Sequence, residues 1–174
     1  MPAAAVQLGK LTTPEGGQFP SCYRRLWMFS EEAKCLGDRV LLIDLDVVLT
    51  SCVDHLFASR ADFVGWQPRA VWGGQRRLGG GMYLLTPGAH SAVFDDFAGE
   101  PSIVEARAAG FRGSDQAWIS YKLRETAELW PDNAGIYSVR DLVRDLPNDA
   151  CLVQFNGQMK PWHRRLPWID GHWR

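Results

Sequence analysis

The 174-residue sequence has no apolar run approaching the roughly 20 residues that a membrane-spanning helix needs. Its first residues, MPAAAVQLGK, lack the positively charged segment and long apolar segment of a secretory signal. The four cysteines, Cys22, Cys35, Cys52 and Cys151, lack the paired spacing that suggests a disulfide framework. These absences predict a cytoplasmic protein whose cysteines are reduced.

Neither sign of charge dominates, since 19 Lys and Arg stand against 20 Asp and Glu. No global field therefore favours nucleic acid or an anionic membrane, and any such binding would have to be local. Apolar residues make up 46% and charged residues 22% of the chain, a balance that indicates a globular protein with a core. The sequence has no internal repeat or linker, and its length predicts a single domain over residues 1–174.

Alternating strand and helix patterns predict an α/β fold. The continuous apolar run in Arg39–Ile43 predicts a central strand that is buried on both faces. Further strands are expected at Asp62–Trp66, Gly81–Leu85, Gly135–Tyr137 and Cys151–Phe155. Helical segments are expected at Cys22–Cys35, Val53–Phe57, Gly88–Ala98, Ser102–Ala109, Ser114–Glu125 and Ser138–Arg144, after an irregular arm over Met1–Pro20.

Two aspartates, Asp44 and Asp46, directly follow the predicted central strand. Alternate side chains of an extended backbone share a face, so both carboxylates are expected on the same side. Ligands of open α/β sheets bind outside the carboxyl ends of strands, and a divalent cation would relieve the repulsion between two acids there. We therefore expect a metal that carries phosphates; alternatively, one aspartate caps the next turn and the other is solvated.

Four blocks of sequence follow one another between residues 43 and 162. They are IDLDVVL at 43–49 leading to DHLF at 54–57, GGGMYLL at 79–85, GSDQAW at 113–118, and VQFNGQMKPW at 153–162. Together they resemble the small bacterial and phage glycosyltransferases related to family 8, from about Tyr23 to the terminus. The resemblance implies a GT-A-like fold: a mixed, mainly parallel sheet flanked by helices, shortened at the N-terminus.

The resemblance also implies a hexosyltransferase. It would move a sugar from a nucleotide-diphosphate donor, with a UDP-sugar expected first, to a hydroxyl acceptor, with retention of the anomeric configuration. In the family the paired aspartates bind Mn²⁺ or Mg²⁺, which assigns Asp44 and Asp46 to the metal and Asp44 also to the donor. The glycine and lysine of the last block hold the donor diphosphate, and here they are Gly157 and Lys160. Lysine offers a point charge to the leaving diphosphate, although Lys160 could also be an ordinary solvated lysine.

Asp115 and Gln116 match family positions that face the sugar and the acceptor, so they are the candidate catalytic residues. The alternative for Asp115 is a purely electrostatic role at the N-terminus of the helix that follows Ser114. Gly80 and Gly81 are candidate donor contacts, because glycine lets backbone approach a sugar closely; a tight turn is the alternative.

Two departures from the family pattern stand out. Gln154 occupies the position where the family usually has a histidine as third metal ligand, and its neutral amide oxygen is a weaker ligand; His163 could substitute. Family members also usually carry an additional β-α-β stretch before the matched segment, which holds the base and ribose of the donor. Its absence leaves three options: a minimal form with a rebuilt pocket, a fragment, or a site completed by another subunit.

Rival functions remain at this level. The run LLIDLDVVL at 41–49 also resembles the motif of haloacid-dehalogenase-type phosphatases, whose first aspartate is a nucleophile. Such a phosphatase also needs a downstream Ser or Thr, a Lys and an acidic pair that completes the metal site. The candidate acidic pair, Asp95 and Asp96, lies in a predicted helix, and no convincing series of these residues follows. A second rival is a non-catalytic nucleotide-sugar-binding protein. The acceptor could be a glycan, a small molecule or a modified DNA or RNA base. The nucleic-acid option follows from Lys160–Arg174, which mixes basic and aromatic residues, although these residues could instead pack over the sheet edge and the diphosphate. The loop arginines Arg69, Arg76 and Arg77 could meet phosphate or remain solvated.

Overall fold

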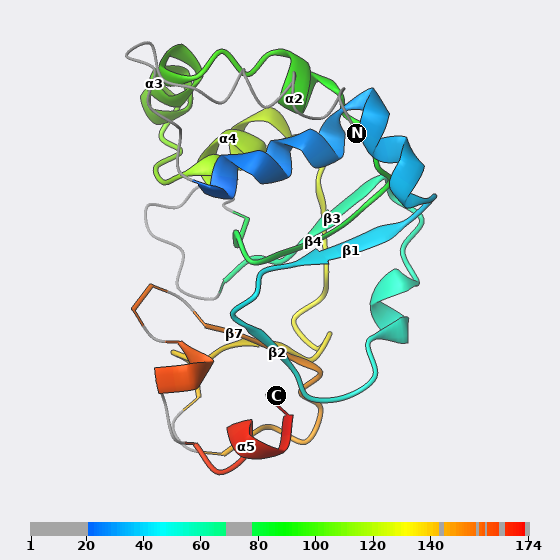
Figure 1. Cartoon of the computed structure of the whole chain (residues 1–174), viewed down its shortest axis with the longest axis vertical. Helices are drawn as coiled ribbons and strands as arrows, with labels where there is room; N and C mark the ends of the chain where they lie inside the picture. The colour runs from blue at the N-terminus through cyan, green and yellow to red at the C-terminus, as the bar shows by residue number, and fades with distance from the viewer. Residues whose placement is uncertain are drawn as a thin grey trace.

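The computed structural model describes residues 21–68, 78–142, 145–155, 157–158, 160–163 and 166–172, and its strands form two sheets (Figure 1). The four-stranded sheet has the order β1 (Val40–Ile43), β4 (Met82–Leu85), β3 (Phe63–Gly65), β5 (Glu128–Leu129). The three-stranded sheet has the order β2 (Val47–Leu49), β7 (Leu152–Gln154), β6 (Ile136–Ser138).

Most helices gather at the end of the molecule that carries the four-stranded sheet (Figure 1). These are the 3-10 helices η2 (Ser21–Phe29) and η3 (Glu31–Leu36), with α2 (Ala92–Asp95), α3 (Glu100–Ala108) and α4 (Asp115–Lys122). The 3-10 helix η4 (Asp54–Phe57) lies beside the sheets, and η5 (Pro161–His163) and α5 (Ile169–His172) lie at the other end, near the three-stranded sheet. Within the described residues, no helix has the length and apolar character needed to cross a bilayer.

The core is built on both faces of β4, whose four residues are all buried. Tyr83 and Leu85 pack with the helices in the largest apolar cluster, which includes Phe29 and Trp118. Met82 and Leu84 point to the other face, where they pack with Val64, Trp66, Trp130 and Leu152. The alternation of side chains along a strand thus places β4 between two apolar layers.

The predicted α/β class and mixed sheet are confirmed, with two parallel pairs, β3–β5 and β6–β7. The expected predominance of parallel pairs is not found among the described strands, since β1–β4, β3–β4 and β2–β7 are antiparallel. Burial of a strand on both faces does not distinguish parallel from antiparallel pairing. β4 is completely buried and yet lies between two antiparallel neighbours.

The prediction that Arg39–Ile43 forms a central, fully buried strand is wrong in position. Among the described strands, β1 pairs only with β4 and lies at the edge of its sheet. Three of its residues are half-buried and Ile43 is exposed. An apolar run indicates that a strand contacts the core, but it does not indicate whether the strand has one or two neighbours in the sheet.

Three predicted helices differ in detail. The segment Cys22–Cys35 forms two 3-10 helices that are interrupted at Ser30. The predicted helix Ser138–Arg144 is wrong over its described residues, because Ser138 ends β6 and a turn follows in which Arg140 N donates to Ser138 Oγ at 3.2 Å. The helix predicted at Gly88–Ala98 shrinks to α2. The arm Met1–Pro20 and the arginines Arg69, Arg76 and Arg77 lie outside the described residues.

Candidate functional site

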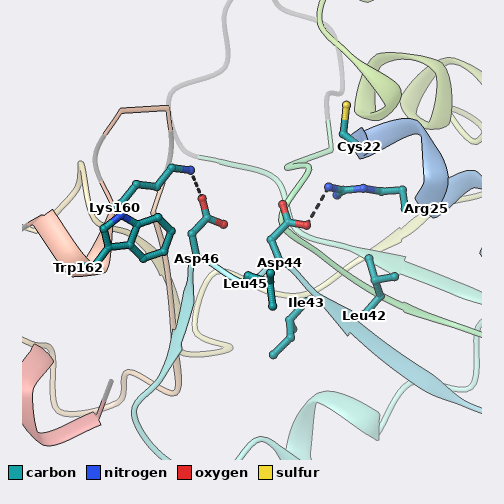
Figure 2. Close-up of a pocket in the computed structure, with 9 residues that line it drawn as sticks. All are labelled: Cys22, Arg25, Leu42, Ile43, Asp44, Leu45, Asp46, Lys160 and Trp162. Atoms are coloured by element: carbon teal, nitrogen blue, oxygen red, sulfur yellow. Dashed lines mark hydrogen bonds and ion pairs between the residues drawn. The ribbon is translucent and has the colours of Figure 1, made fainter. Parts of the chain in front are cut away.

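A pocket of about 410 Å³ opens at the end of β1, where the chain passes from one sheet to the other (Figure 2). Its lining combines four charged side chains with four apolar ones and a thiol. The charged residues are Arg25, Asp44, Asp46 and Lys160. The others are Cys22, Leu42, Ile43, Leu45 and Trp162.

The backbone around the two aspartates explains why they face one pocket. Asp44 N donates to Gly81 O at 2.8 Å, which holds the end of β1 against the start of β4. Val47 N donates to Asp44 O at 3.1 Å, so a turn through Leu45 links β1 to β2, and Leu45 is 90% exposed. Asp46 is anchored in turn by Phe155 N, which donates to Asp46 O at 3.1 Å. The carboxylates therefore converge across a turn, whereas the sequence predicted that they would share one face of an extended strand.

Each aspartate in the pocket is paired with a basic side chain (Figure 2). Arg25 Nη2 donates to Asp44 Oδ1 at 2.8 Å. Lys160 Nζ donates to Asp46 Oδ2. Among the residues that line the pocket, two basic side chains therefore balance two aspartates.

Asp115 is connected to the pocket through Arg25. The residue is 1% exposed and does not line the pocket, but its Oδ2 lies 2.7 Å from Arg25 Nε. Ser114 Oγ donates to Asp115 Oδ1 at 2.9 Å. Burial raises the pKa of Asp115, while the charge of Arg25 and the hydrogen bond from Ser114 oppose the rise. Arg25 thus joins the predicted metal ligand Asp44 to the predicted catalytic residue.

Two side-chain amides fill the space that the glycines before β4 leave open. A Cβ atom on Gly80 would overlap Gln116 Oε1, and a Cβ atom on Gly81 would overlap Gln154 Nε2. Gln154 is buried, and its Oε1 has no hydrogen-bond partner among the described residues. The missing side chains of Gly80 and Gly81 therefore make room for the protein's own amides, and the predicted donor contacts would have to come from their backbone.

The remaining predicted residues lie outside the set that lines the pocket. Gly157 has a positive φ of 63° and lies near Arg140, outside the residues that line the pocket. His163 contacts Trp162 edge-on, with ring centroids 5.8 Å apart. Asp96, which the phosphatase hypothesis would need, forms an ion pair with Lys122. Neither His163 nor Asp96 lines the pocket.

Arg25 and Cys22 are site residues that the sequence patterns did not reveal. Both belong to η2, whose apolar spacing identified only its buried face. Burial raises the pKa of the Cys22 thiol, and the negative charge of Asp115 raises it further. No spacing in the sequence connects Arg25 to Asp44 or Asp115, because both contacts are tertiary.

Among solved structures, the chain is similar to two glycosyltransferases. The galactosyltransferase LgtC, in complex with donor and acceptor sugar analogs, matches at a TM-score of 0.55 and 14% identity over 79% of this chain. The glycosyltransferase GlyE of Streptococcus pneumoniae TIGR4 matches at a TM-score of 0.52 and 14% identity over 90% of this chain. The fold is therefore of the GT-A type found in these glycosyltransferases.

The likeness is one of fold. No family model matches the sequence, and no curated protein matches it. The chain covers 63% of the length of LgtC and 42% of the length of GlyE.

Proposed function

We propose that this protein is a glycosyltransferase that moves a sugar from a nucleotide-diphosphate donor to a hydroxyl acceptor with the help of a divalent cation. One observation carries the proposal. In a glycosyltransferase fold, Asp44 and Asp46 line one pocket at the end of a strand together with Lys160, which lies 114 residues from Asp46 in the sequence. Ligands of α/β sheets bind at such strand ends.

The donor set suits a hard cation such as Mg²⁺ or Mn²⁺. Asp44 and Asp46 offer carboxylate oxygens, and the buried Gln154 Oε1 is an oxygen without a partner among the described residues. Gln154 lies against Gly81, whose carbonyl binds Asp44 N. No group of three His, Cys, Asp or Glu that could hold a metal occurs among the described residues, and the proposed third protein ligand is the neutral amide of Gln154. A bound cation would neutralise charge on the donor's phosphates.

The protein's own residues supply the remaining functions. Lys160 offers its ammonium group to the diphosphate as the bond to the sugar breaks. Trp162 is 54% exposed in the same pocket and offers a ring face to the donor. Asp115 acts through Arg25, which it holds against Asp44, and Gln116 beside Gly80 faces the sugar. Gly157, whose φ is 63°, is the candidate for a close backbone approach to the diphosphate.

UDP-sugars are the first donors to test, and glycans, small molecules or modified nucleic-acid bases are the acceptor classes. The experiment measures release of nucleoside diphosphate from a panel of nucleotide sugars with Mn²⁺, with Mg²⁺ and with EDTA. We expect cation-dependent release that Asp46→Asn abolishes. Asp54→Asn, an exposed aspartate of η4 outside the pocket, is the matched control and should retain the activity.

A non-catalytic binding protein is the second candidate, because Asp115 is buried and its carboxylate does not line the pocket. Such a protein would bind a nucleotide sugar tightly in the presence of the cation and would release no diphosphate with any acceptor. Thermal-shift measurements on the same panel, combined with the release assay, separate the two cases, since both candidates predict stabilisation by the ligand but only the enzyme predicts turnover.

A further inference from the structure

We propose that Lys160 is a resident counter-ion of Asp46 that moves to the donor's diphosphate when a cation takes its place, so that cation and diphosphate bind cooperatively. This inference rests on the proposed function and concerns the order and coupling of binding at the same site. Lys160 then has two partners, Asp46 in the unliganded protein and the diphosphate in the complex, whereas the family resemblance implies only the diphosphate.

The contact between Lys160 and Asp46 is the observation that carries the inference (Figure 2). Lys160 immediately precedes η5, and Asp46 lies in the turn between β1 and β2. The side chains of Lys160 and Asp46 are 28% and 15% exposed. Water screens a half-buried ion pair less than a surface pair, so Lys160 neutralises Asp46 effectively in this state.

A cation that binds Asp46 has to compete with this ammonium group. Two positive groups on one carboxylate repel each other, and their repulsion is strong in a partly desolvated pocket. Lys160 must therefore leave Asp46, and in doing so it loses its ion-pair partner. Binding of the cation alone is weakened by that loss.

The diphosphate removes the penalty, because its oxygens give Lys160 a new anionic partner in the same pocket. The cation and the diphosphate consequently each favour the state that the other needs. Linkage requires that each tightens the other's binding by the same factor.

Arg25 behaves differently from Lys160, although it also neutralises an aspartate of the pocket. Its guanidinium contacts both Asp44 and Asp115, and its side chain is 13% exposed. Arg25 can therefore give up Asp44 and keep Asp115. The lysine, which sits on a flexible stem with a single ion-pair partner among the described residues, is the cation that moves.

The test is calorimetric titration of Mn²⁺ into the protein with and without saturating UDP. For the unaltered protein we expect UDP to tighten Mn²⁺ binding by a factor on the order of ten or more. In Lys160→Met, Mn²⁺ alone should bind several-fold more tightly than in the unaltered protein, and the effect of UDP should shrink several-fold. Complex formation between Mn²⁺ and UDP in solution is the same for the unaltered protein and for Lys160→Met, so it cancels when the two proteins are compared.

Two controls isolate the role of the charge. Lys160→Arg retains a cation beside Asp46 and should keep the weak binding of Mn²⁺ alone. Lys34→Met removes a lysine from the exposed pair with Glu31 and should change neither quantity. If Lys160→Met does not fold, Lys160→Gln tests the same expectation.

The outcomes are distinct. Tighter Mn²⁺ binding with reduced coupling in Lys160→Met supports the inference. If Lys160→Met loses affinity for UDP but binds Mn²⁺ alone no more tightly, Lys160 serves only the diphosphate, and the inference is wrong while the proposed function stands. If the unaltered protein binds neither Mn²⁺ nor UDP, the proposed function fails first.

Discussion

Arg25 and Asp115 form a buried ion pair in which Nε lies 2.7 Å from Oδ2, with side-chain exposures of 13% and 2%. The same guanidinium reaches Asp44 Oδ1 at 2.8 Å, so one arginine of η2 connects the turn after β1 to the start of α4. The carboxylates of Asp44 and Asp115 would repel each other, and the guanidinium of Arg25 compensates both charges. This arrangement places the first-turn acid of α4 in the electrostatics of the pocket rather than in contact with its contents.

Removing Arg25 should therefore destabilise the fold more than removing a surface cation. Arg25→Met leaves the carboxylate of Asp115 buried without its partner, and we expect a loss of about 3–5 kcal/mol in the free energy of unfolding. Urea denaturation measures it. Adding Asp115→Asn should recover part of the loss, since the uncompensated charge is then gone. Lys34→Met removes a lysine from the exposed pair with Glu31 and should cost no more than about 1 kcal/mol in the free energy of unfolding. If Arg25→Met and Lys34→Met lost the same free energy, the interpretation would be contradicted.

Gly81 should be intolerant of a side chain because of Gln154. The Cβ atom of Gly81→Ala would overlap the amide of Gln154, and we expect a cost of about 1–3 kcal/mol in stability together with weaker Mn²⁺ binding. Combining it with Gln154→Ala removes the overlapping group, so the double variant should be more stable than the sum of the single effects predicts. The matched control is Gly171→Ala in α5, where a Cβ atom meets nothing within 4 Å. Simple additivity of Gly81→Ala and Gln154→Ala would disprove the contact.

Local patterns in the sequence predicted the parts of the site that depend on local geometry. Asp44 and Asp46 follow an apolar run directly, and the block around Lys160 is contiguous, so both could be recognised without the fold. Arg25 could not be, since its partners Asp44 and Asp115 come close only after η2 packs beside α4 and the end of β1. A tertiary ion pair leaves no periodic trace in the sequence.

The same distinction explains the errors in the fold. The apolar residues of β1 correctly predicted a strand, but the edge position depends on which other strands are present. At Ser138 the helical prediction failed because the hydroxyl accepts a hydrogen bond from Arg140 N and stabilises a turn instead. A short apolar–polar pattern there fits both a helix and a strand that ends in a turn.

Cys22 offers a chemical probe of the pocket. Burial and the charge of Asp115 raise the pKa of its thiol, so alkylation by iodoacetamide near pH 8 should be slower at Cys22 than at the exposed Cys35 and Cys52. The rate at Cys22 should keep rising as the pH increases and the thiolate forms. Mass spectrometry of the modified peptides measures each rate. UDP with Mn²⁺ should slow Cys22 further and leave Cys35 and Cys52 unchanged; equal protection of all three would rule out a local effect.

Trp162 should contribute to donor binding more than to stability. It is 54% exposed and lines the pocket, so its ring is available to stack on a base or a sugar. We expect Trp162→Ala to weaken UDP binding by about 1–3 kcal/mol, which is about ten- to hundredfold, with little change in melting temperature. Trp162→Phe should retain most of the affinity, because it keeps a ring face. Calorimetry gives both values, and an unchanged affinity in Trp162→Ala would remove this residue from the donor site.

Gln154 allows the proposed metal site to be tested by its choice of cation. Imidazole nitrogen favours Mn²⁺ and Zn²⁺, whereas carboxylate and amide oxygens suit Mg²⁺ equally well. Gln154→His should therefore tighten Mn²⁺ binding by roughly tenfold and leave Mg²⁺ binding little changed, which raises the preference for Mn²⁺. The ratio of the two affinities, measured by calorimetry, is insensitive to general changes in stability. Gln158→His introduces the same group at an exposed position after β7 and should leave the ratio as it is. The Gln154 side chain lies against Gly81, and Gly81 O accepts the hydrogen bond that positions Asp44. If Gln154→His leaves the ratio of Mn²⁺ to Mg²⁺ affinity unchanged, residue 154 does not reach the cation.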